Sequence, residues 1–168
     1  GIDYNAHLST VKNYNKTVAV LPSGISNIYP KGHRDLCDEI LHNKGCILSE
    51  YFPYETAYKN HFIERDRLQS AISLGVVVVE CDENSGTMHT VNFAKEHNKI
   101  IGCFKHKNIN LNCRDGNKKL LKDKNTLMID NNFDINHLDY LLKNKLFETN
   151  NIIFKLDLPK EQISFKIN

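Results

Sequence analysis

Short runs of β-branched and other apolar residues alternate along this chain with longer stretches in which apolar residues recur every three or four positions. Runs of the first kind predict strands, and stretches of the second kind predict helices that bury one face. The predicted strands cover residues 17–21, 46–48, 76–79, 99–104 and 126–129. The predicted helices cover residues 4–11, 34–42, 62–74, 87–97, 115–122 and 135–143. Strands that alternate with helices predict an α/β protein.

The run Val76-Val77-Val78-Val79 indicates the type of sheet. Four consecutive valines predict a strand that is buried on both faces, as in a parallel sheet covered by helices. We therefore expect a doubly wound, mostly parallel sheet in one domain that spans residues 1–150. Residues 151–168 alternate between polar and apolar side chains around Pro159. They predict a C-terminal hairpin or edge extension, too short for a separate domain.

Composition narrows the classes of function without choosing one. The formal net charge of +2 is too small to indicate nucleic-acid binding, so any basic surface must be local. The five cysteines form no C-x-x-C pair, which predicts small buried side chains in a reducing compartment. Cys103, His106 and Cys113 lack a second tight pair of ligands, so no metal site is expected. Without a membrane span or a signal peptide, the expected location is cytoplasmic.

The loop after the valine run is the first candidate for binding. Ser85-Gly86-Thr87 opens a predicted helix at the carboxyl edge of the sheet, where open α/β sheets bind ligands. The free N–H groups of a helix start favour phosphate. A capped helix without any ligand is the alternative interpretation.

The segment Tyr58–Arg65 is the second candidate. A protein that binds single-stranded DNA needs cations along the phosphates and an exposed aromatic ring on which a base can stack. Lys59 and Phe62 provide both near a helix start. Alternatively, Phe62 packs the helix start against the core, and Lys59 is a solvated surface residue.

Two arginines and an acidic residue complete this candidate. Arg65 and Arg67 are two positions apart, so they point to nearly opposite sides of a helix. We expect Arg65 to reach the ligand edge and Arg67 to pair internally, with Glu50 or Glu80. Ser49 and Glu50 end a strand at the same edge, where Glu50 either orders a basic side chain or caps neighbouring amides.

Six motifs occur in the order seen in one protein family. They are Gly1-Ile2-Asp3 with Ala6-His7, Thr17-Val18-Ala19-Val20 leading to Gly24 and Tyr29-Pro30, Leu48-Ser49-Glu50, Phe62 with Arg65-Asp66-Arg67, Ser85-Gly86-Thr87, and Asp115-Gly116-Asn117. Over residues 1–123 the chain thus resembles the DprA/Smf family of DNA-processing proteins. The resemblance implies a Rossmann-like domain that binds single-stranded DNA, forms a homodimer, and helps to load the RecA recombinase on incoming DNA during natural transformation.

The resemblance also implies roles for individual residues. It implies DNA contacts for Lys59 and Phe62. From the segments described above we also expect DNA or phosphate contacts for Arg65, Ser85, Gly86 and Thr87, and support of that site by Gly24, Ser49, Glu50 and Arg67.

The chain departs from the family pattern in three places. The family's domain normally begins with a strand, a Gly-Ser-Arg or Gly-Thr-Arg phosphate loop, a helix and a second strand, none of which precedes Gly1. We therefore expect an N-terminally truncated sheet, the chain being either a fragment or one whose missing half comes from a partner chain. Where the family has Arg-Asn-Arg, this chain has Arg65-Asp66-Arg67. Where the family has Pro-Gly, after the fourth predicted strand, this chain has Lys105-His106.

A truncated sheet leaves a strand edge beside residues 17–21 without a neighbour. Exposed edges and apolar patches drive association. We expect the chain either to self-associate or to cover this edge with the helix at 4–11 and the segment 152–167.

Catalysis and cofactors are not expected. The chain has no H-E-x-x-H motif. A related family of nucleotide phosphoribohydrolases carries the motif Pro-Gly-Gly-x-Gly-Thr-x-x-Glu, in which the Glu is part of the active site. In this chain the position of that Glu is occupied by Thr90. Two alternative functions stay open: a phosphoribohydrolase-like enzyme, and a protein that senses a small nucleotide at Ser85 and Gly86.

Overall fold

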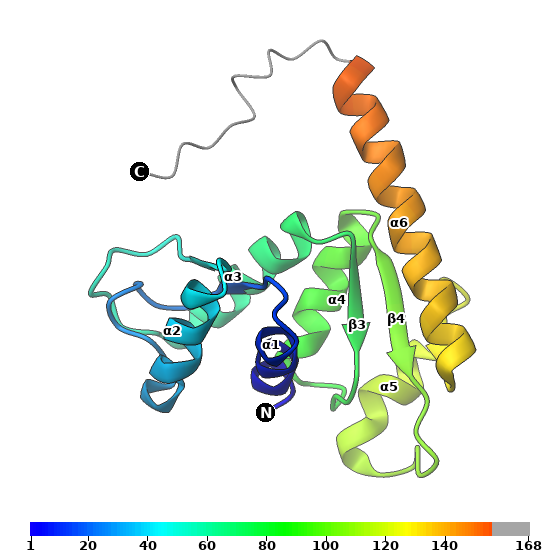
Figure 1. Ribbon diagram of the computed structural model, residues 1–168. Helices are drawn as coiled ribbons and strands as arrows, with labels where there is room; N and C mark the ends of the chain where they lie inside the picture. The colour runs from blue at the N-terminus through cyan, green and yellow to red at the C-terminus, as the bar shows by residue number, and fades with distance from the viewer. Residues whose placement is uncertain (156–168) are drawn as a thin grey trace.

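Helices and strands alternate along the chain (Figure 1), as the sequence pattern predicted. The computed structural model describes the backbone of residues 1–155 and the side chains of residues 1–149. The helices are α1 (Ile2–Lys12), α2 (Arg34–His42), α3 (Lys59–Ile72), α4 (Gly86–Glu96), α5 (Asp115–Leu120) and α6 (Asn132–Lys155). The strands are β1 (Val18–Val20), β2 (Cys46–Leu48), β3 (Gly75–Val78), β4 (Ile100–Phe104) and β5 (Thr126–Ile129). The predicted α/β class and Rossmann-like architecture are confirmed.

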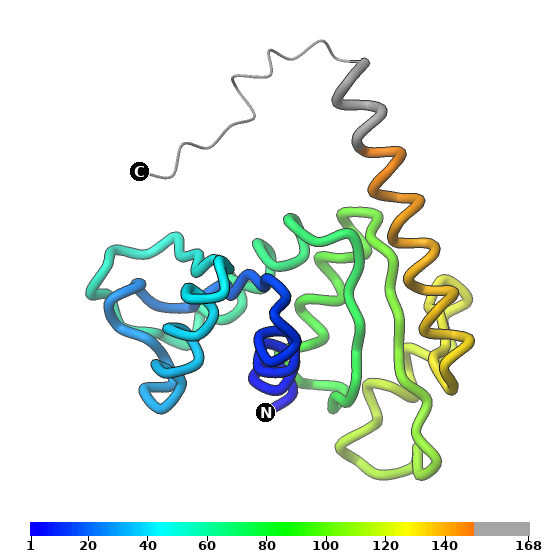
Figure 2. Tube along the Cα trace, in the orientation of Figure 1, coloured from blue at the N-terminus to red at the C-terminus, as the bar shows by residue number. Residues whose placement is uncertain are grey.

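The five strands form two parallel sheets. In one sheet β1 pairs with β2, and in the other the order is β3-β4-β5. All pairings are parallel, as predicted, but within the described residues no strand joins β1 to β3. In Figure 2 the segment from β1 to β2 lies on one side, the segment from β3 to α6 lies on the other, and α3 connects them. β1 and β3 therefore each have one edge without a strand neighbour.

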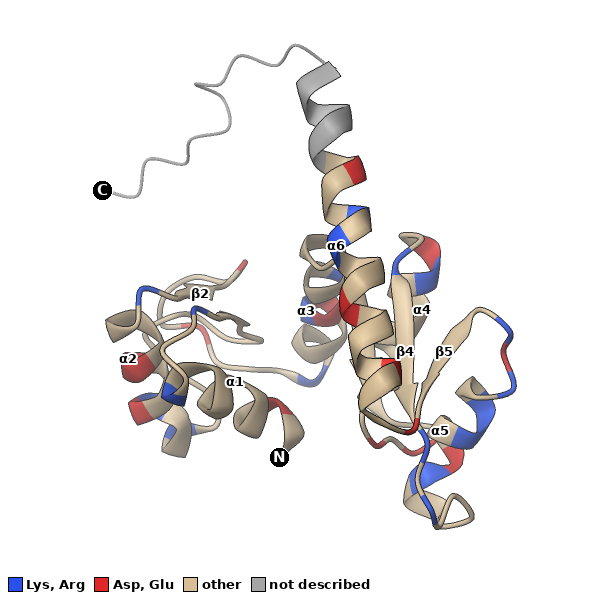
Figure 3. Cartoon of the chain, turned by 45° about the vertical axis from the view of Figure 1, so that its right-hand side comes forward, with Lys and Arg blue, Asp and Glu red and all other residues tan. Residues whose placement is uncertain are grey.

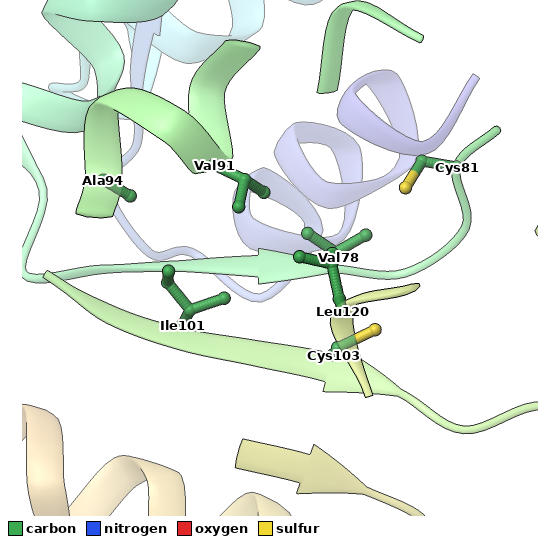
Figure 4. Close-up of a cluster of buried hydrophobic side chains, with 7 residues drawn as sticks. All are labelled: Val78, Cys81, Val91, Ala94, Ile101, Cys103 and Leu120. Carbon is green, nitrogen blue, oxygen red and sulfur yellow. The ribbon is translucent and has the colours of Figure 1, made fainter. Parts of the chain in front are cut away.

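The main core lies between the larger sheet and helix α4 (Figure 4). Val78 and Ile101 project from β3 and β4 toward Val91 and Ala94 of α4, and Leu120 of α5 closes one end. Val91 and Ala94 are fully buried. Full burial of a Val, Leu or Ile side chain stabilises a fold by about 1.5–3 kcal/mol. This cluster therefore holds α4 on the sheet. A smaller cluster of α1, β1 and α2 residues stabilises the other sheet.

The opposite face of the larger sheet is covered only in part. Leu138 of α6 packs near Gly102, and Leu142 packs near Gly75. Val77, between these contacts and at the edge of the sheet, is 43% exposed. The prediction that the valine strand is buried on both faces is therefore wrong at Val77, because β3 is an edge strand with no strand neighbour on one side.

Helix α6 corrects the prediction for the C-terminal segment. The predicted helix at 135–143 begins three residues earlier, because the Asn131 side chain accepts hydrogen bonds from the N–H groups of Phe133 and Asp134 at 2.8 and 3.2 Å. The helix continues to Lys155. Residues 151–155, predicted as part of a hairpin, are thus helical, since the helical pattern of α6 outweighs their alternation. The rest of the predicted extension, residues 156–168, lies outside the described residues.

The cysteines are all free thiols. Cys37, Cys81 and Cys103 are buried, as expected for small apolar side chains, whereas Cys113 is exposed. Burial raises the pKa of Cys103 to about 11, which keeps this thiol protonated. Of the helices in the described part of the chain, none combines the length and apolar character that crossing a lipid bilayer requires.

Candidate nucleic-acid interface

Two adjoining hollows lie between the free edges of β1 and β3. The larger, of about 470 Å³, is bordered by Ala19 and Val20 of β1, and the smaller, of about 380 Å³, by Val76 and Val77 of β3. Both share the same wall from α1, α3 and α4. The shared residues are Asp3, Phe62, Arg65, Gln69 and Thr87. Cavities of this size are typical of ligand sites.

Helix α3 places Phe62 in the wall of both hollows and Lys59 one turn earlier, where it lines neither of them. The helix begins at Lys59, three residues before the predicted start, so Lys59 and Phe62 are neighbours on one side of its first turn. The Phe62 ring lies edge-on to Tyr29, with ring centroids 5.7 Å apart. Phe62 is only partly buried, so it packs on Tyr29 and also borders both hollows, and its contact with a DNA base stays a prediction. Lys59 is exposed and takes part in none of the ion pairs in the described part of the chain.

Arg65 lies inside the site and already has protein partners. Its Nη1 donates to the carbonyl of Val20 at 2.8 Å, and its Nε donates to Asp66 at 3.0 Å. The Val20 carbonyl faces the free edge of β1, so the guanidinium occupies a position where a neighbouring strand would donate. The side chain is only 17% exposed. Arg65 thus borders both hollows, but two of its N–H groups are not free for a phosphate, and its contact with a ligand stays a prediction.

Asp66 is a buried carboxylate between α3 and α4. Its burial raises the pKa of its carboxyl group, although the neighbouring Arg65 guanidinium acts in the opposite direction. An acid whose pKa is raised in the folded state stabilises the fold most at low pH, and that contribution is lost as the pH rises through the raised pKa.

We therefore expect Asp66→Asn to make the protein more stable than wild type at pH 7. The Asn oxygen still accepts from Arg65 Nε, but it carries no charge to bury. The advantage should shrink as the pH falls to about 4, the ordinary range for an aspartate. Urea unfolding at both pH values measures the difference, with the exposed Asp38→Asn as the control. A less stable Asp66→Asn variant at pH 7 would mean that the ion pair outweighs the cost of burial.

Glu50, Arg67, Ser49 and Gly24 make contacts beyond the end of β2 and border neither hollow. Arg67 donates twice to the Glu50 carboxylate, at 2.9 and 2.7 Å. Of the two partners expected for Arg67, the structure therefore shows Glu50 and not Glu80. Ser49 Oγ donates to the carbonyl of Ser23 at 2.8 Å and accepts from the N–H of Tyr51 at 3.0 Å. Gly24 is buried against the backbone of residues 52–53. These four residues hold loops together, and their support of a binding site stays a prediction.

The segment Ser85-Gly86-Thr87 lies where α4 begins. Ser85 is the N-cap residue in extended conformation, but its hydroxyl is buried and has no hydrogen-bond partner among the described residues. Gly86 borders the smaller hollow, and Thr87 borders both. The structure thus brings Phe62, Arg65, Gly86 and Thr87 together around one space, with Lys59 one turn earlier on α3.

Gly116 and Asn117 position that segment, a role that the sequence pattern did not reveal. Asn117 is fully buried. Its side chain accepts from the N–H of Cys81 at 2.8 Å and donates to the carbonyls of Val79 and Phe104 at 2.9 and 3.1 Å. A Cβ on Gly116 would lie 2.5 Å from the Cys81 sulfur. These two residues tie the ends of β3 and β4 to α5, and so fix the loop that leads into α4.

His106 and Lys105, which replace the family's Pro-Gly, also have structural partners. His106 Nε2 donates to the carbonyl of Val79 at 2.6 Å, and Lys105 pairs with Asp130 at 3.0 Å. The departure at these positions therefore adds contacts at the end of β4.

Lys and Arg residues gather on α5 and the loops beside it (Figure 3). Several of them are neutralised by ion pairs: Arg114 with Glu80 at 2.8 Å and Lys119 with Glu83 at 2.7 Å. The bond from Arg114 lowers the pKa of Glu80 below its ordinary value. This basic area is therefore a weaker candidate for DNA than the residue composition suggests.

Sequence reasoning missed Tyr29 and Gln69 as residues of the site. Tyr29 was noted only as part of a motif, and its contact with Phe62 joins segments that are far apart in the chain. Gln69 follows Phe62 by seven positions on α3, so the helical period was the signal that could have identified it. Within the described residues, no group of three His, Cys, Asp or Glu side chains is arranged to hold a metal ion.

Known proteins are similar to this chain in sequence and in fold. The family model of DNA recombination-mediator protein A matches residues 1–138. DNA processing protein DprA of Streptococcus pneumoniae is 38% identical over 101 residues, a match that covers 60% of this chain and 36% of that protein. Protein Smf of a Synechocystis species is 36% identical over 101 residues, covering 60% of this chain and 25% of that protein. The chain thus spans about a third or less of these relatives.

Two solved structures are similar over most of the chain. The X-ray structure of DprA from Streptococcus pneumoniae superposes with a TM-score of 0.71 at 30% identity, covering 80% of this chain and 47% of that one. A structure of DNA processing protein A from Helicobacter pylori, which concerns its single-stranded DNA binding mode, gives a TM-score of 0.68 at 25% identity, covering 84% and 72%. The match to residues 1–138 and these similarities confirm the resemblance in the sequence: the chain belongs to the DNA recombination-mediator protein A family, the DprA/Smf DNA-processing proteins.

Proposed function

We propose that this chain binds single-stranded DNA without catalysing a reaction on it. The observation that carries the proposal is the convergence of Phe62, Arg65, Gly86 and Thr87 on one space, with the exposed Lys59 beside them. An aromatic ring next to a cation fits a base and its phosphate. The start of α4 adds backbone N–H groups that favour phosphate.

The rest of the proposal concerns the biological setting. The chain would act in natural transformation and recombination, as a cytoplasmic homodimer that protects incoming DNA and helps to load the RecA recombinase. The recombination-mediator family supports this role, and the free cysteines fit a reducing compartment. A non-enzymatic role is supported by Thr90, which stands where the phosphoribohydrolase pattern has its Glu. The alternative is that Ser85 and Gly86 bind a small nucleotide in place of DNA.

The test is a binding titration with oligo-dT and with a duplex of equal length. The chain should bind oligo-dT more tightly than duplex, and its affinity should fall as salt rises because phosphate contacts release counterions. Lys59→Ala should reduce the slope of log affinity against log salt by about one. Phe62→Ala should cost about 1–3 kcal/mol with the slope nearly unchanged, because it removes a stacked base and no charge.

Matched controls are available for both variants. Lys16 is exposed at the opposite, amino-terminal end of β1, and Phe133 is 77% exposed at the start of α6, so Lys16→Ala and Phe133→Ala should bind like wild type. Equal loss of slope in the Lys59 and Phe62 variants would contradict the proposed division of roles. Full competition by excess mononucleotide would favour the small-nucleotide alternative.

A further inference from the structure

A third hollow lies at the carboxyl ends of β4 and β5 and shares no lining residue with the two hollows of the proposed DNA site. This outer hollow has a volume of about 560 Å³. Lys105 directly follows β4, Asp130 directly follows β5, and both line it. Open α/β sheets bind ligands outside the carboxyl ends of their strands, and cavities of about 300–1,000 Å³ hold small ligands.

Part of the lining of the outer hollow is apolar. It consists of Ile109, Leu121 and Met128. Leu121 packs against the main core, so this wall is continuous with the rigid interior of the domain. Met128 belongs to the edge strand β5 and is 49% exposed. Because a methionine thioether makes favourable contacts with aromatic rings, the wall fits a flat apolar ring.

Another part of the lining is basic. Lys107 is exposed and takes part in none of the ion pairs among the described residues. Lys105 pairs with Asp130 at 3.0 Å, where both side chains are about half exposed. Such a pair contributes little to stability, and an ammonium group has three donors. Lys105 can therefore hold a phosphate and Asp130 at the same time.

The segment that carries both lysines is held in place by two hydrogen bonds. The N–H of Lys105 donates to the carbonyl of Ile129 at 2.8 Å, and His106 Nε2 donates to that of Val79 at 2.6 Å. Lys105-His106 stands where the family has Pro-Gly, and neither Pro nor Gly has a cationic side chain. This basic lining is therefore particular to the present chain.

Asp130 adds an acceptor to the same lining. A carboxylate accepts hydrogen bonds from hydroxyl groups, and an acidic side chain near the carboxyl edge of a parallel sheet holds ribose hydroxyls in dinucleotide-binding folds. The outer hollow thus offers cations for a phosphate, a carboxylate for a ribose and an apolar wall for a base.

We propose that the outer hollow binds a mononucleotide. The phosphate contacts Lys105 and Lys107, the ribose hydroxyls donate to Asp130, and the base lies against Met128. This site goes beyond the proposed function, because it is separate from the proposed DNA site and from the alternative nucleotide site at the start of α4.

The test is calorimetric titration of the intact chain with adenosine monophosphate (AMP). AMP should bind at one site per chain. Adenosine, which lacks the phosphate, and inorganic phosphate, which lacks the base, should each bind at least about tenfold more weakly, because each loses one set of contacts. Equal affinity for AMP and adenosine would overturn the role of the lysines. Equal affinity for AMP and inorganic phosphate would overturn the role of the apolar wall.

Two variants locate the nucleotide. Lys107→Ala and Met128→Gln should each weaken AMP binding about tenfold, through loss of a charged hydrogen bond and of the ring contact. Their controls are Lys124→Ala and Leu111→Gln, because both residues are exposed and line none of the three hollows. All four positions are at least partly exposed, so thermal unfolding should be similar in all variants.

The outcomes separate this inference from the proposed function. AMP should leave the affinity for oligo-dT unchanged, and Lys107→Ala should bind oligo-dT like wild type. Absence of AMP binding, or equal AMP affinity in Lys107→Ala and Lys124→Ala, would overturn the inference and leave DNA binding untouched. Competition between AMP and oligo-dT would also overturn it, in favour of a nucleotide at the start of α4. Absence of oligo-dT binding with AMP binding intact would instead reject the proposed function alone.

Discussion

Replacing Asn117 by alanine is expected to lower the free energy of unfolding by at least about 2 kcal/mol, since two buried polar groups lose their partner and each such loss costs about 1–3 kcal/mol. The Asn117 side chain satisfies the N–H of Cys81 and the carbonyls of Val79 and Phe104. All three lie at the carboxyl ends of β3 and β4, where water has little access because Asn117 itself is fully buried. Alanine would leave the Cys81 N–H and the Phe104 carbonyl without this partner, whereas the Val79 carbonyl would keep its hydrogen bond from His106.

Chemical denaturation of wild type and Asn117→Ala measures this loss. The control is Asn110→Ala, because Asn110 is exposed and its side chain only accepts a long hydrogen bond from Lys118 at 3.4 Å; a change within about 0.5 kcal/mol is expected there. Oligo-dT binding should also weaken in Asn117→Ala, because the loop into α4 loses its anchor. Equal stability of the two variants would mean that backbone groups near Cys81 find other partners.

Gly24→Ala is expected to destabilise the fold by about 1–3 kcal/mol, the usual cost of forcing a methyl group into a packed site. A Cβ on Gly24 would overlap the backbone carbonyl groups of Phe52 and Pro53. Backbone atoms cannot move aside as the end of a flexible side chain can, so the turn at residues 52–55 must separate from the loop that follows β1. The variant should therefore also bind oligo-dT less tightly than wild type, because the loop that follows β1 carries Tyr29, which contacts Phe62.

Thermal unfolding and the same binding titration test this prediction. Gly32→Ala is the matched control, since a Cβ there has no neighbour within 4 Å. That variant should change stability by less than about 0.5 kcal/mol. If Gly24→Ala melted like Gly32→Ala, the close approach of the two loops would not be required for the fold.

Local patterns were sufficient to predict most of the secondary structure. The bounds of α2, β2 and β5 agree with those predicted from the sequence, because each is a short periodic or β-branched segment with polar residues at its ends. The start of α3 was placed three residues late. Its first turn carries Lys59, Asn60 and His61, which give no apolar signal, so the pattern could not show that these residues were helical.

Candidate site residues were found where one segment carries the signal. Lys59 and Phe62 were identified from adjacent residues, and the structure places Phe62 beside Arg65 and Thr87. The engagement of Arg65 by the Val20 carbonyl could not be predicted, because it joins residues 45 positions apart. The same holds for the contact between Phe62 and Tyr29.

The sequence by itself determined the alternation of strands and helices, their parallel pairing and the family, since these depend on periodicity and on short motifs. Only the tertiary structure decided that the strands form two sheets with free edges at β1 and β3, that Val77 is partly exposed, and that Asn117 holds the ends of β3 and β4. The physical reason is that burial and hydrogen bonding depend on which distant segments meet. Periodicity shows which face of an element is apolar, but it does not show what covers that face.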